Sequence, residues 1–258
     1  MITRRTVLGL AASAIARSAS LPEQSAALVL ERAFSGADLS YLLLDARTGR
    51  TIAARWLRID EPAPVGSLVK PFTALAYGET HEFRFPIYAC NGDRCWFEHG
   101  HGRLNVVHAI AHSCNAYFLE LAADVDRDAL ESIVQKFGLA VPSTMTPAAL
   151  IGLHGIWQVP PVAIARAYIE LANRSTEPVL TGMALSARSG TGRGVGPGAY
   201  VKTGTAVCMH DVHANGDGYV MAVYPIAAPR HALLIRQHGV PGAQAAYTCG
   251  RMRTILGT

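Results

Sequence analysis

The sequence predicts an α+β protein in which strands from both ends of the chain form one antiparallel sheet beside a helical middle. Half of its 258 residues are hydrophobic and only 16% are charged, so the chain can bury a sizeable core. Short apolar runs bounded by Gly, Pro, Asp and His at 39–54 and 200–236 are typical of strands. Between them, from 70 to 174, apolar residues recur every three to four positions, as in helices that pack on one face. We therefore expect an antiparallel sheet flanked by helices, plus a helical subdomain.

Residues 1–20 are predicted to be an export signal. Met1–Arg5 is basic, Thr6–Ala16 is apolar, and small residues suited to cleavage follow. The Arg4-Arg5 pair resembles a twin-arginine signal, while an ordinary Sec signal and an uncleaved interfacial anchor are the alternatives. The apolar run is shorter than the ~20 residues that cross a bilayer, and no later run is long enough. We expect an exported protein, periplasmic or at the cell surface.

The charge of the chain argues against a nucleic-acid partner. The formal net charge is +4, and three of the positive charges, Arg4, Arg5 and Arg17, lie in the predicted signal. The rest of the chain therefore carries about +1, too little for a surface that binds phosphate backbones.

Residues 21–258 are expected to form one domain, with a sheet part at 21–66 and 186–258 and a helical part at 67–185. A hairpin is predicted from Leu39–Leu44 and Arg50–Ala54, joined by a turn. The predicted helices of the middle are Val106–Ala111, Ala116–Ala123, Arg127–Phe137 and Pro161–Asn173. The later strands are predicted at Tyr200–Ala206, Tyr219–Tyr224 and Ala232–Arg236, before a closing helix at Ala243–Leu256.

The first motif that can carry chemistry is Ser67-Leu-Val-Lys70. Residues three apart share one face of a helix, so the Lys70 amine can reach the Ser67 hydroxyl. Pro71 lacks an N–H, which favours a tight first turn over 67–70. A serine hydroxyl needs an adjacent base, and Lys70 can serve if burial or a second cation lowers its pKa towards neutrality. Alone, the motif is weak evidence, because Ser and Lys are common on ordinary helix surfaces.

Two further motifs follow in a fixed order. Ser113-Cys-Asn115 precedes an apolar helix and supplies a hydroxyl able to pass a proton. Lys202-Thr-Gly-Thr205 lies on a predicted strand, where Lys202 supplies the second cation. Gly204 has no side chain, so we expect room for a substrate backbone beside it. Each triplet is common by itself, but the three together, in this order and on these elements, are specific.

With these motifs the chain resembles the serine penicillin-recognising enzymes, which include penicillin-binding transpeptidases and serine β-lactamases. The resemblance extends from about Asp38 to Leu256. Leu42–Ala54 is similar to the family's first hairpin, and Gly190-Thr-Gly192 to the run into its closing strands. Gly100-His-Gly-Arg-Leu-Asn-Val is similar to elongation-type class B penicillin-binding proteins. The fold that this resemblance implies is that of the serine β-lactamases and penicillin-binding transpeptidases.

The resemblance also implies roles for the catalytic residues. Ser67 would be the acylated nucleophile, with Lys70 as its general base. Ser113 would relay a proton to the leaving amine, and Asn115 would hold the substrate amide or Lys70. Lys202 would keep the local field positive.

The third motif would then form the substrate-binding strand. Thr203 and Thr205 would bind the terminal carboxylate beside Gly204, and the backbone N–H groups of Ser67 and Thr205 would hold the oxyanion. The implied substrate is the D-Ala-D-Ala end of a peptidoglycan stem peptide, with β-lactams as mimics. Catalysis would require no cofactor, and a cell-wall synthesis protein is a possible partner.

Several departures from the family pattern keep alternatives open. The second motif is Ser-Cys-Asn instead of Ser-Asp-Asn, and the stretch between Asn115 and Lys202 is short. We expect no pedestal or glycosyltransferase domain, so both a DD-carboxypeptidase and a DD-transpeptidase fit. A serine β-lactamase is an alternative, although Glu170-Leu-Ala-Asn173 only superficially resembles the class A Glu-x-x-Leu-Asn signature. A non-catalytic sensor of β-lactams or muropeptides is another.

A group of cysteines and a histidine suggests a structural zinc ion. The candidate ligands, a Cys₃His set, are Cys90, Cys95, His101 and Cys114. Such a site would clamp the preceding loop onto the Ser113–Asn115 corner. The alternative is a Cys90–Cys95 disulfide, favoured by an oxidising compartment, with Cys114 as a buried filler. Cys208 and Cys249 are expected to be core thiols.

Overall fold

The computed structural model describes residues 21–174, 177–208 and 216–257, and it is built around a five-stranded antiparallel sheet. The strands run in the order β2-β1-β9-β8-β7. Their bounds are β1 Leu39–Asp45, β2 Thr51–Arg55, β7 Tyr200–Ala206, β8 Asp217–Tyr224 and β9 His231–His238. The sheet therefore joins both ends of the chain, and the predicted α+β class is confirmed. The predicted export signal at 1–20 lies outside the described residues.

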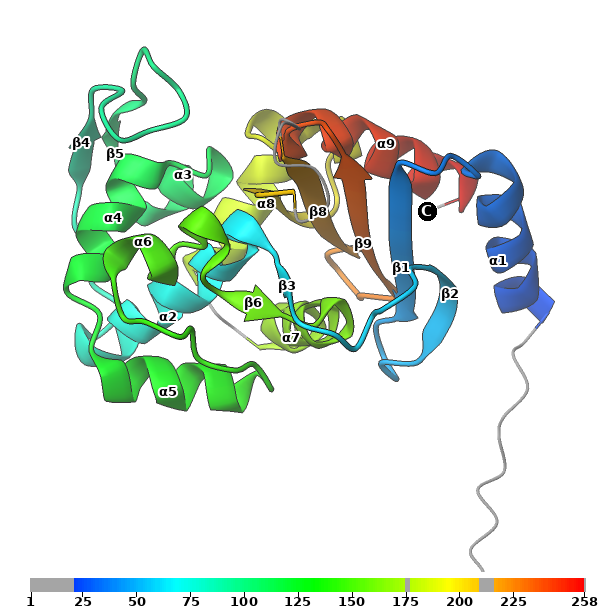
Figure 1. The fold of residues 1–258 in the computed structure, drawn as a ribbon, viewed down its shortest axis with the longest axis horizontal. Helices are drawn as coiled ribbons and strands as arrows, with labels where there is room; N and C mark the ends of the chain where they lie inside the picture. The colour runs from blue at the N-terminus through cyan, green and yellow to red at the C-terminus, as the bar shows by residue number, and fades with distance from the viewer. Residues whose placement is uncertain (1–20, 175–176, 209–215, 258) are drawn as a thin grey trace, which may run out of the picture.

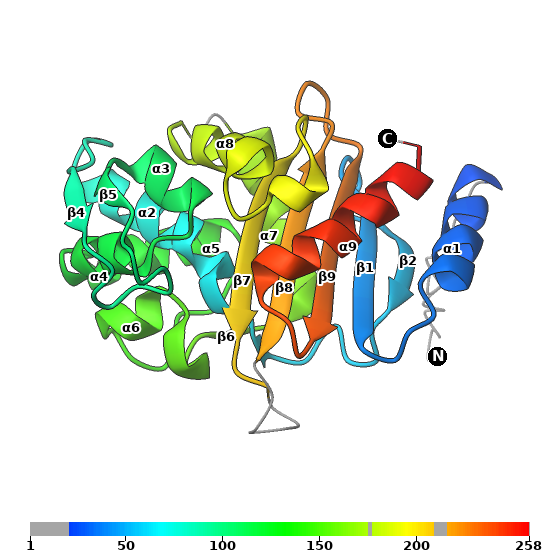
Figure 2. The same cartoon turned by 90° about the horizontal axis from the view of Figure 1, so that it is seen from above.

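Helices cover both faces of this sheet, as Figures 1 and 2 show. Helix α9 (Gly242–Ile255) crosses one face, and α7 (Pro161–Asn173) lies on the other. Helix α1 (Leu21–Ala33) packs beside β2 at the outer edge, and α8 (Val179–Ser189) packs beside β7. The 3-10 helix η3 (Arg193–Val195) packs against α9 and α8. Successive residues of a strand point to opposite faces, so the central strands are apolar on both sides. In β9, for example, Leu234 joins the core under α7 and Leu233 the core under α9.

The helical half lies beside the β7 edge of the sheet (Figure 2). Its elements are α2 Lys70–Thr80, α3 Val106–Ala111, α4 Asn115–Ala123, α5 Arg127–Lys136, α6 Pro147–Leu150 and the 3-10 helix η2 Leu153–Gly155. Two small two-stranded sheets complete it, β3 (Ala63–Pro64) with β6 (Gln158–Val159), and β4 (Tyr88–Cys90) with β5 (Gly102–Leu104). The predicted hairpin and the four predicted middle helices are confirmed to within a residue or two.

Helix α7 lies within the segment expected as the helical part but packs on the sheet. Its buried Ile164, Tyr168 and Leu171 belong to the same core cluster as Met221 and Leu234 of the sheet. The apolar face of α7 has the helical period, and the period alone does not say which neighbour covers that face. Helix α7 therefore links the two halves of the molecule.

The nucleophile segment folds as a tight turn. Gly66–Val69 forms the 3-10 helix η1, and α2 continues from Lys70 with Pro71 in its first turn. This confirms the tight first turn predicted from the position of Pro71. All four residues of η1 are buried, and the Tyr168 hydroxyl donates a 2.7 Å hydrogen bond to the Leu68 carbonyl from α7.

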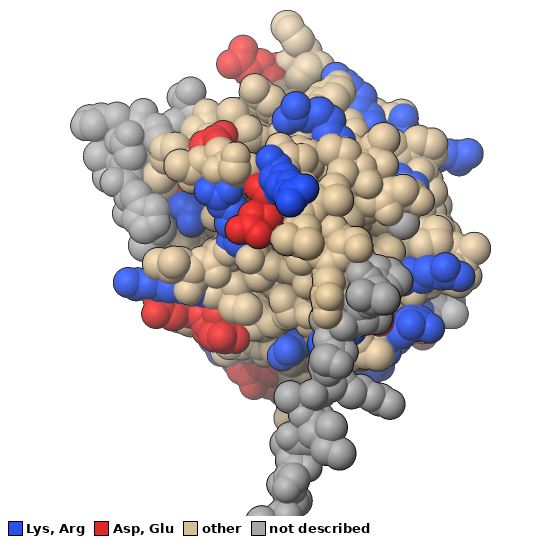
Figure 3. Space-filling model, turned by 90° about the vertical axis from the view of Figure 1, so that its right-hand side faces the viewer, with Lys and Arg blue, Asp and Glu red and all other residues tan. Residues whose placement is uncertain are grey.

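The surface agrees with a modest net charge. On the face shown in Figure 3, Lys and Arg side chains are interspersed with Asp and Glu instead of forming a basic patch. Among the described residues, no helix is both long and apolar enough to cross a membrane.

Candidate active site

The three sequence motifs converge where the helical half meets β7. Lys70, in the first turn of α2, donates hydrogen bonds of 2.9 Å to the Ser113 carbonyl and 2.6 Å to Asn115 Oδ1. Lys202, from the middle of β7, donates a 2.7 Å bond to Ser113 Oγ and a 2.6 Å bond to the Thr203 carbonyl. Ser113 therefore accepts a bond from each lysine, one on its backbone and one on its side chain. Lys70 lies 43 positions before Ser113 and 132 positions before Lys202, so segments far apart in the sequence meet at this point.

The Ser113 corner has a strained backbone. Ser113 adopts a φ of 52°, a left-handed conformation that is uncommon for a residue with a side chain. It lies between α3 and α4, and its N–H bonds to the Ile110 carbonyl at 3.2 Å. This conformation turns the carbonyl towards Lys70 while the hydroxyl faces Lys202. The strain is located where the two motifs meet.

Burial lowers the pKa of both lysines. Both side chains are fully buried. Loss of hydration lowers the pKa of Lys70 from 10.5 to about 7, although the Cys114 and Cys95 sulfurs oppose the shift. Burial also lowers the pKa of Lys202 well below its usual value, and the nearby Lys70 charge lowers it further. A neutral amine is therefore accessible to Lys70 near neutral pH, as a general base requires.

Ser67 lies in η1, which packs against β7 near Lys202. In the described chain its hydroxyl is not hydrogen-bonded to Lys70, whose protons go to Ser113 and Asn115. Catalytic hydrogen bonds are often poorly aligned until substrate is bound. The structure thus brings Lys70, Ser113, Asn115 and Lys202 into direct contact and sets Ser67 one helical turn before Lys70.

Two glycines allow η1 to approach β7. A Cβ on Gly66, whose φ is +55°, would lie 2.5 Å from the Thr205 carbonyl oxygen. A Cβ on Gly204 would lie 2.7 Å from the Val65 oxygen and 3.3 Å from the Ser67 nitrogen. On the side to which a Gly204 side chain would project, the nucleophile turn already fills the space. Substrate contact along the edge of the strand stays a prediction. The same approach brings the backbone nitrogens of Ser67 and Thr205 near each other.

A threonine that the sequence analysis did not single out joins β7 to the Ser113 corner. Thr203 Oγ1 donates a 2.6 Å bond to Thr191 Oγ1, and Thr191 donates its N–H to the Ala111 carbonyl at 3.0 Å. The preceding residue, Gly190, packs closely against Ala111, since a Cβ on Gly190 would lie 2.1 Å from the Ala111 carbonyl oxygen. In the sequence, the Gly-Thr-Gly triplet at 190–192 was the signal that could have pointed to Thr191. On the other side, Thr205 Oγ1 accepts a 3.0 Å bond from the Gly242 N–H.

Trp96 borders the site and was also not predicted to contribute. Its indole is half-exposed and lies in the loop between β4 and β5. Its Nε1–H lies 3.2 Å from the carbonyl oxygens of His112 and Ser113. The Ser113 carbonyl thus accepts from Lys70 on one side and from Trp96 on the other.

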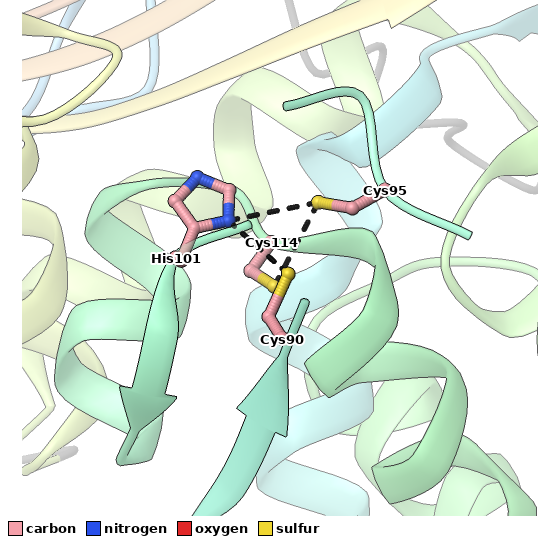
Figure 4. Close-up of side chains that lie close together, drawn as sticks. All are labelled: Cys90, Cys95, His101 and Cys114. Atoms are coloured by element: carbon pink, nitrogen blue, oxygen red, sulfur yellow. Dashed lines mark hydrogen bonds between the residues drawn. The ribbon is translucent and has the colours of Figure 1, made fainter. Parts of the chain in front are cut away.

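The predicted zinc ligands come together directly behind this corner, as Figure 4 shows. His101 Nδ1 lies 3.5 Å from Cys90 Sγ and 3.6 Å from Cys95 Sγ, and Cys95 Sγ lies 3.9 Å from Cys114 Sγ. A tetrahedral zinc ion with Zn–S bonds of about 2.3 Å and Zn–N bonds of about 2.0 Å separates its ligands by about 3.5–3.8 Å. The donor set and its spacing fit zinc. Cys90 and Cys95 are free cysteines in the structure.

The fold is shared with transpeptidase domains of known structure. PBP2 of Pseudomonas aeruginosa in complex with WCK 5153 superposes with a TM-score of 0.76 at 20% identity, over 91% of this chain and 73% of that one. The transpeptidase domain of the FtsI4 D,D-transpeptidase from Legionella pneumophila superposes with a TM-score of 0.66 at 17% identity, over 92% of this chain and 94% of that one. PBP2 of Helicobacter pylori in complex with MreC superposes with a TM-score of 0.75 at 17% identity, over 91% of this chain and 62% of that one. These likenesses establish the penicillin-binding transpeptidase fold.

The sequence itself places the chain in the same family. The family model of the penicillin binding protein transpeptidase domain matches residues 39–183, more than half of the chain. The chain therefore belongs to the penicillin-binding protein transpeptidase family, whose members are serine acyltransferases. A search of curated proteins finds no match.

Proposed function

We propose that this protein is a penicillin-binding serine acyltransferase that attacks D-Ala-D-Ala stem peptides through a Ser67 acyl-enzyme. The observation that carries this proposal is the meeting of two buried lysines on Ser113, beside the turn that holds Ser67. In the proposed reaction neutral Lys70 takes the Ser67 proton, Ser67 Oγ bonds to the penultimate D-Ala carbonyl carbon, and the terminal D-Ala leaves. Ser113, bonded to Lys202, passes the proton to the leaving nitrogen.

The third motif is proposed to bind the donor. Strand β7 is at the sheet edge, so alternate backbone groups face away from β8 and can pair with an extended peptide. Thr203 and Thr205 lie on this strand, beside buried Lys202, and would bind the terminal carboxylate. The Ser67 and Thr205 N–H groups would hold the oxyanion, and one such donor contributes about 3–4 kcal/mol to lowering a barrier.

We favour a transpeptidase or carboxypeptidase over a β-lactamase. Rapid hydrolysis of the acyl-enzyme needs a base for the attacking water. Glu170, which superficially resembles that base in sequence, lies on α7 with about half of its side chain exposed and pairs with Arg174 at 3.6 Å. In the described chain no carboxylate pairs with Lys70 or Lys202. The resulting acyl-enzyme would be long-lived with a β-lactam.

The test is covalent labelling by a fluorescent penicillin, followed by gel electrophoresis and intact mass spectrometry. We expect one adduct per chain in the wild type, none in Ser67→Ala, and full labelling in the control Ser132→Ala, an exposed serine on α5. Release of D-Ala from a pentapeptide would separate an enzyme from a sensor. Many turnovers of nitrocefin per second would favour the β-lactamase and contradict the proposal.

We also propose a structural zinc ion, an exported location and a cell-wall partner. Cys90, Cys95, His101 and Cys114 would hold the zinc, with no role in the chemical step. Export rests on the sequence of residues 1–20. A partner protein is suggested by the Helicobacter pylori relative, whose structure is a complex with MreC.

A further inference from the structure

A second cluster of metal-ligand side chains lies at the far end of β7, apart from the Cys₃His cluster. Cys208 follows β7, Asp217 begins β8 and His238 ends β9. One ligand atom of each lies within 4.8 Å of the other two. We propose that these three side chains bind a divalent transition-metal ion, with zinc-like ligand preference, at the base of the β7–β8 hairpin.

The sheet register brings these residues together. Asp217 pairs with Ala206 of β7 on one side and with His238 of β9 on the other. Residues directly opposite in neighbouring antiparallel strands project to the same face, so the carboxylate and the imidazole meet there. Cys208 lies two residues beyond Ala206 and reaches the same place. Three strands therefore contribute one ligand each.

The distances between the three ligand atoms are compatible with one metal centre. His238 Nδ1 lies 3.5 Å from Cys208 Sγ and 2.9 Å from Asp217 Oδ1. In a tetrahedral zinc site a sulfur and a nitrogen ligand are about 3.5 Å apart. A metal ion would satisfy all three atoms after the oxygen and nitrogen separate by a few tenths of an ångström.

Charge and burial support the same inference. The Asp217 side chain is only 2% exposed, and Arg236 binds its Oδ2 through Nε at 2.7 Å, which leaves Oδ1 for the ion. The Asp217 charge is paired with Arg236, so a Cys208 thiolate would supply the additional negative charge to a divalent cation. The His238 side chain is 43% exposed, so an ion can enter from solvent. The Asp217–Arg236 pair explains the buried carboxylate by itself, but it does not require a sulfur at position 208.

Occupancy would restrain the end of the substrate-binding strand. Cys208 is three residues beyond Thr205, and its attachment to β8 and β9 would limit movement of this part of β7. The inference does not depend on the proposed acyl-transfer reaction, since binding can be measured without turnover.

The test measures metal binding in the full chain, using Zn²⁺ content after reconstitution and the thiolate-to-cobalt absorption of the Co²⁺ form. A Cys95→Ser background weakens the Cys₃His cluster. In that background we expect about one ion per chain, with cobalt–thiolate absorption, and loss of both on adding Cys208→Ser or His238→Gln. Both variants keep the Asp217–Arg236 pair, and thermal melting checks that they fold. The control Cys249→Ser, a buried thiol of α9, should change neither signal. Unchanged zinc content and cobalt absorption in Cys208→Ser and His238→Gln would overturn the proposal.

Discussion

Lys70 and Lys202 are fully buried ammonium groups, and neither has a carboxylate partner among the described residues. An amine without a counter-charge is destabilised in its protonated form when it loses water. The charge of Lys70 lowers the pKa of Lys202 further, and both amines bond to Ser113. Burial therefore brings the pKa of Lys70 to about 7 and lowers the pKa of Lys202 well below its usual value.

The first prediction concerns pH. Because burial lowers the pKa of Lys70 to about 7, the neutral base form increases as pH rises through that value. Below pH ~7 the penicillin acylation rate constant should fall about tenfold per pH unit, and above it the rate constant should level off. The measurement is stopped-flow acylation across this range. Lys70→Arg should not be acylated at any pH in the range, and a flat wild-type profile would remove Lys70 as the base.

The second prediction tests what the indole N–H of Trp96 contributes to acylation. Trp96→Phe keeps an aromatic ring but removes the Nε1–H that lies 3.2 Å from the Ser113 carbonyl. A hydrogen bond contributes about 1 kcal/mol net, so acylation should slow about fivefold without a matching change in penicillin binding. Phe97→Leu, a change at the neighbouring ring, is the control and should leave the rate unchanged. A rate in Trp96→Phe equal to that of the wild type would show that the indole only covers the corner.

At the scale of elements, the approach of η1 to β7 sets the position of Ser67. Gly66 and Gly204 each lack the Cβ that would collide with the opposite backbone. Tyr168 of α7 holds η1 from behind through the Leu68 carbonyl. The nucleophile turn is thus fixed between a strand and a helix that are distant from it in sequence.

This arrangement predicts that Gly204→Ala moves the nucleophile turn η1 away from β7. The new Cβ would lie 2.7 Å from the Val65 oxygen, so the turn or the strand must shift. We expect loss of penicillin labelling by at least about a hundredfold, because misplacement by about 1 Å has that effect on catalysis. Gly49→Ala is the control, since a Cβ there has open space and only the positive φ of 68° is penalised. It should cost about 1 kcal/mol, or about 2–4 °C in Tm, with normal labelling. Normal labelling in Gly204→Ala would contradict this role.

At the scale of the whole molecule, the Cys₃His cluster ties three separate segments together. Its ligands come from β4, from the loop before β5 and from the start of α4 (Figure 4). The same segments carry Trp96 and Ser113, so an ion bound there would stabilise the folded chain and the corner of the site together.

The corresponding prediction is a metal-dependent stability. Removal of zinc by a chelator should lower the Tm of the wild type, since an ion that binds only the folded state at 100 times its Kd contributes about 2.7 kcal/mol. Cys95→Ser should start from a lower Tm and lose less of it on adding chelator than the wild type does, whereas Cys249→Ser should respond as the wild type does. Mass spectrometry showing a loss of two protons between Cys90 and Cys95, with no zinc bound, would favour the disulfide instead.

Local sequence patterns predicted much of the fold and the chemistry of each motif. Helical and strand periods predicted the hairpin, the middle helices and α9, because burial of one face imposes a period on each element. The spacing of Ser67 and Lys70 placed them on one turn, and Pro71 indicated that the turn is tight. These features depend only on neighbours within about one turn of the chain.

Only the tertiary structure decided how the motifs act on one another. The left-handed Ser113, the bond from Thr203 to Thr191 and the donor from Trp96 join segments whose separation carries no local signal. Gly204 was assigned to substrate contact from sequence, but its missing side chain admits the backbone of η1. Likewise Cys208 was predicted to be a core thiol, and only the register of β7, β8 and β9 places it beside Asp217 and His238. Local periodicity records which residues face inward, whereas the identity of the neighbour is set by packing over the whole chain.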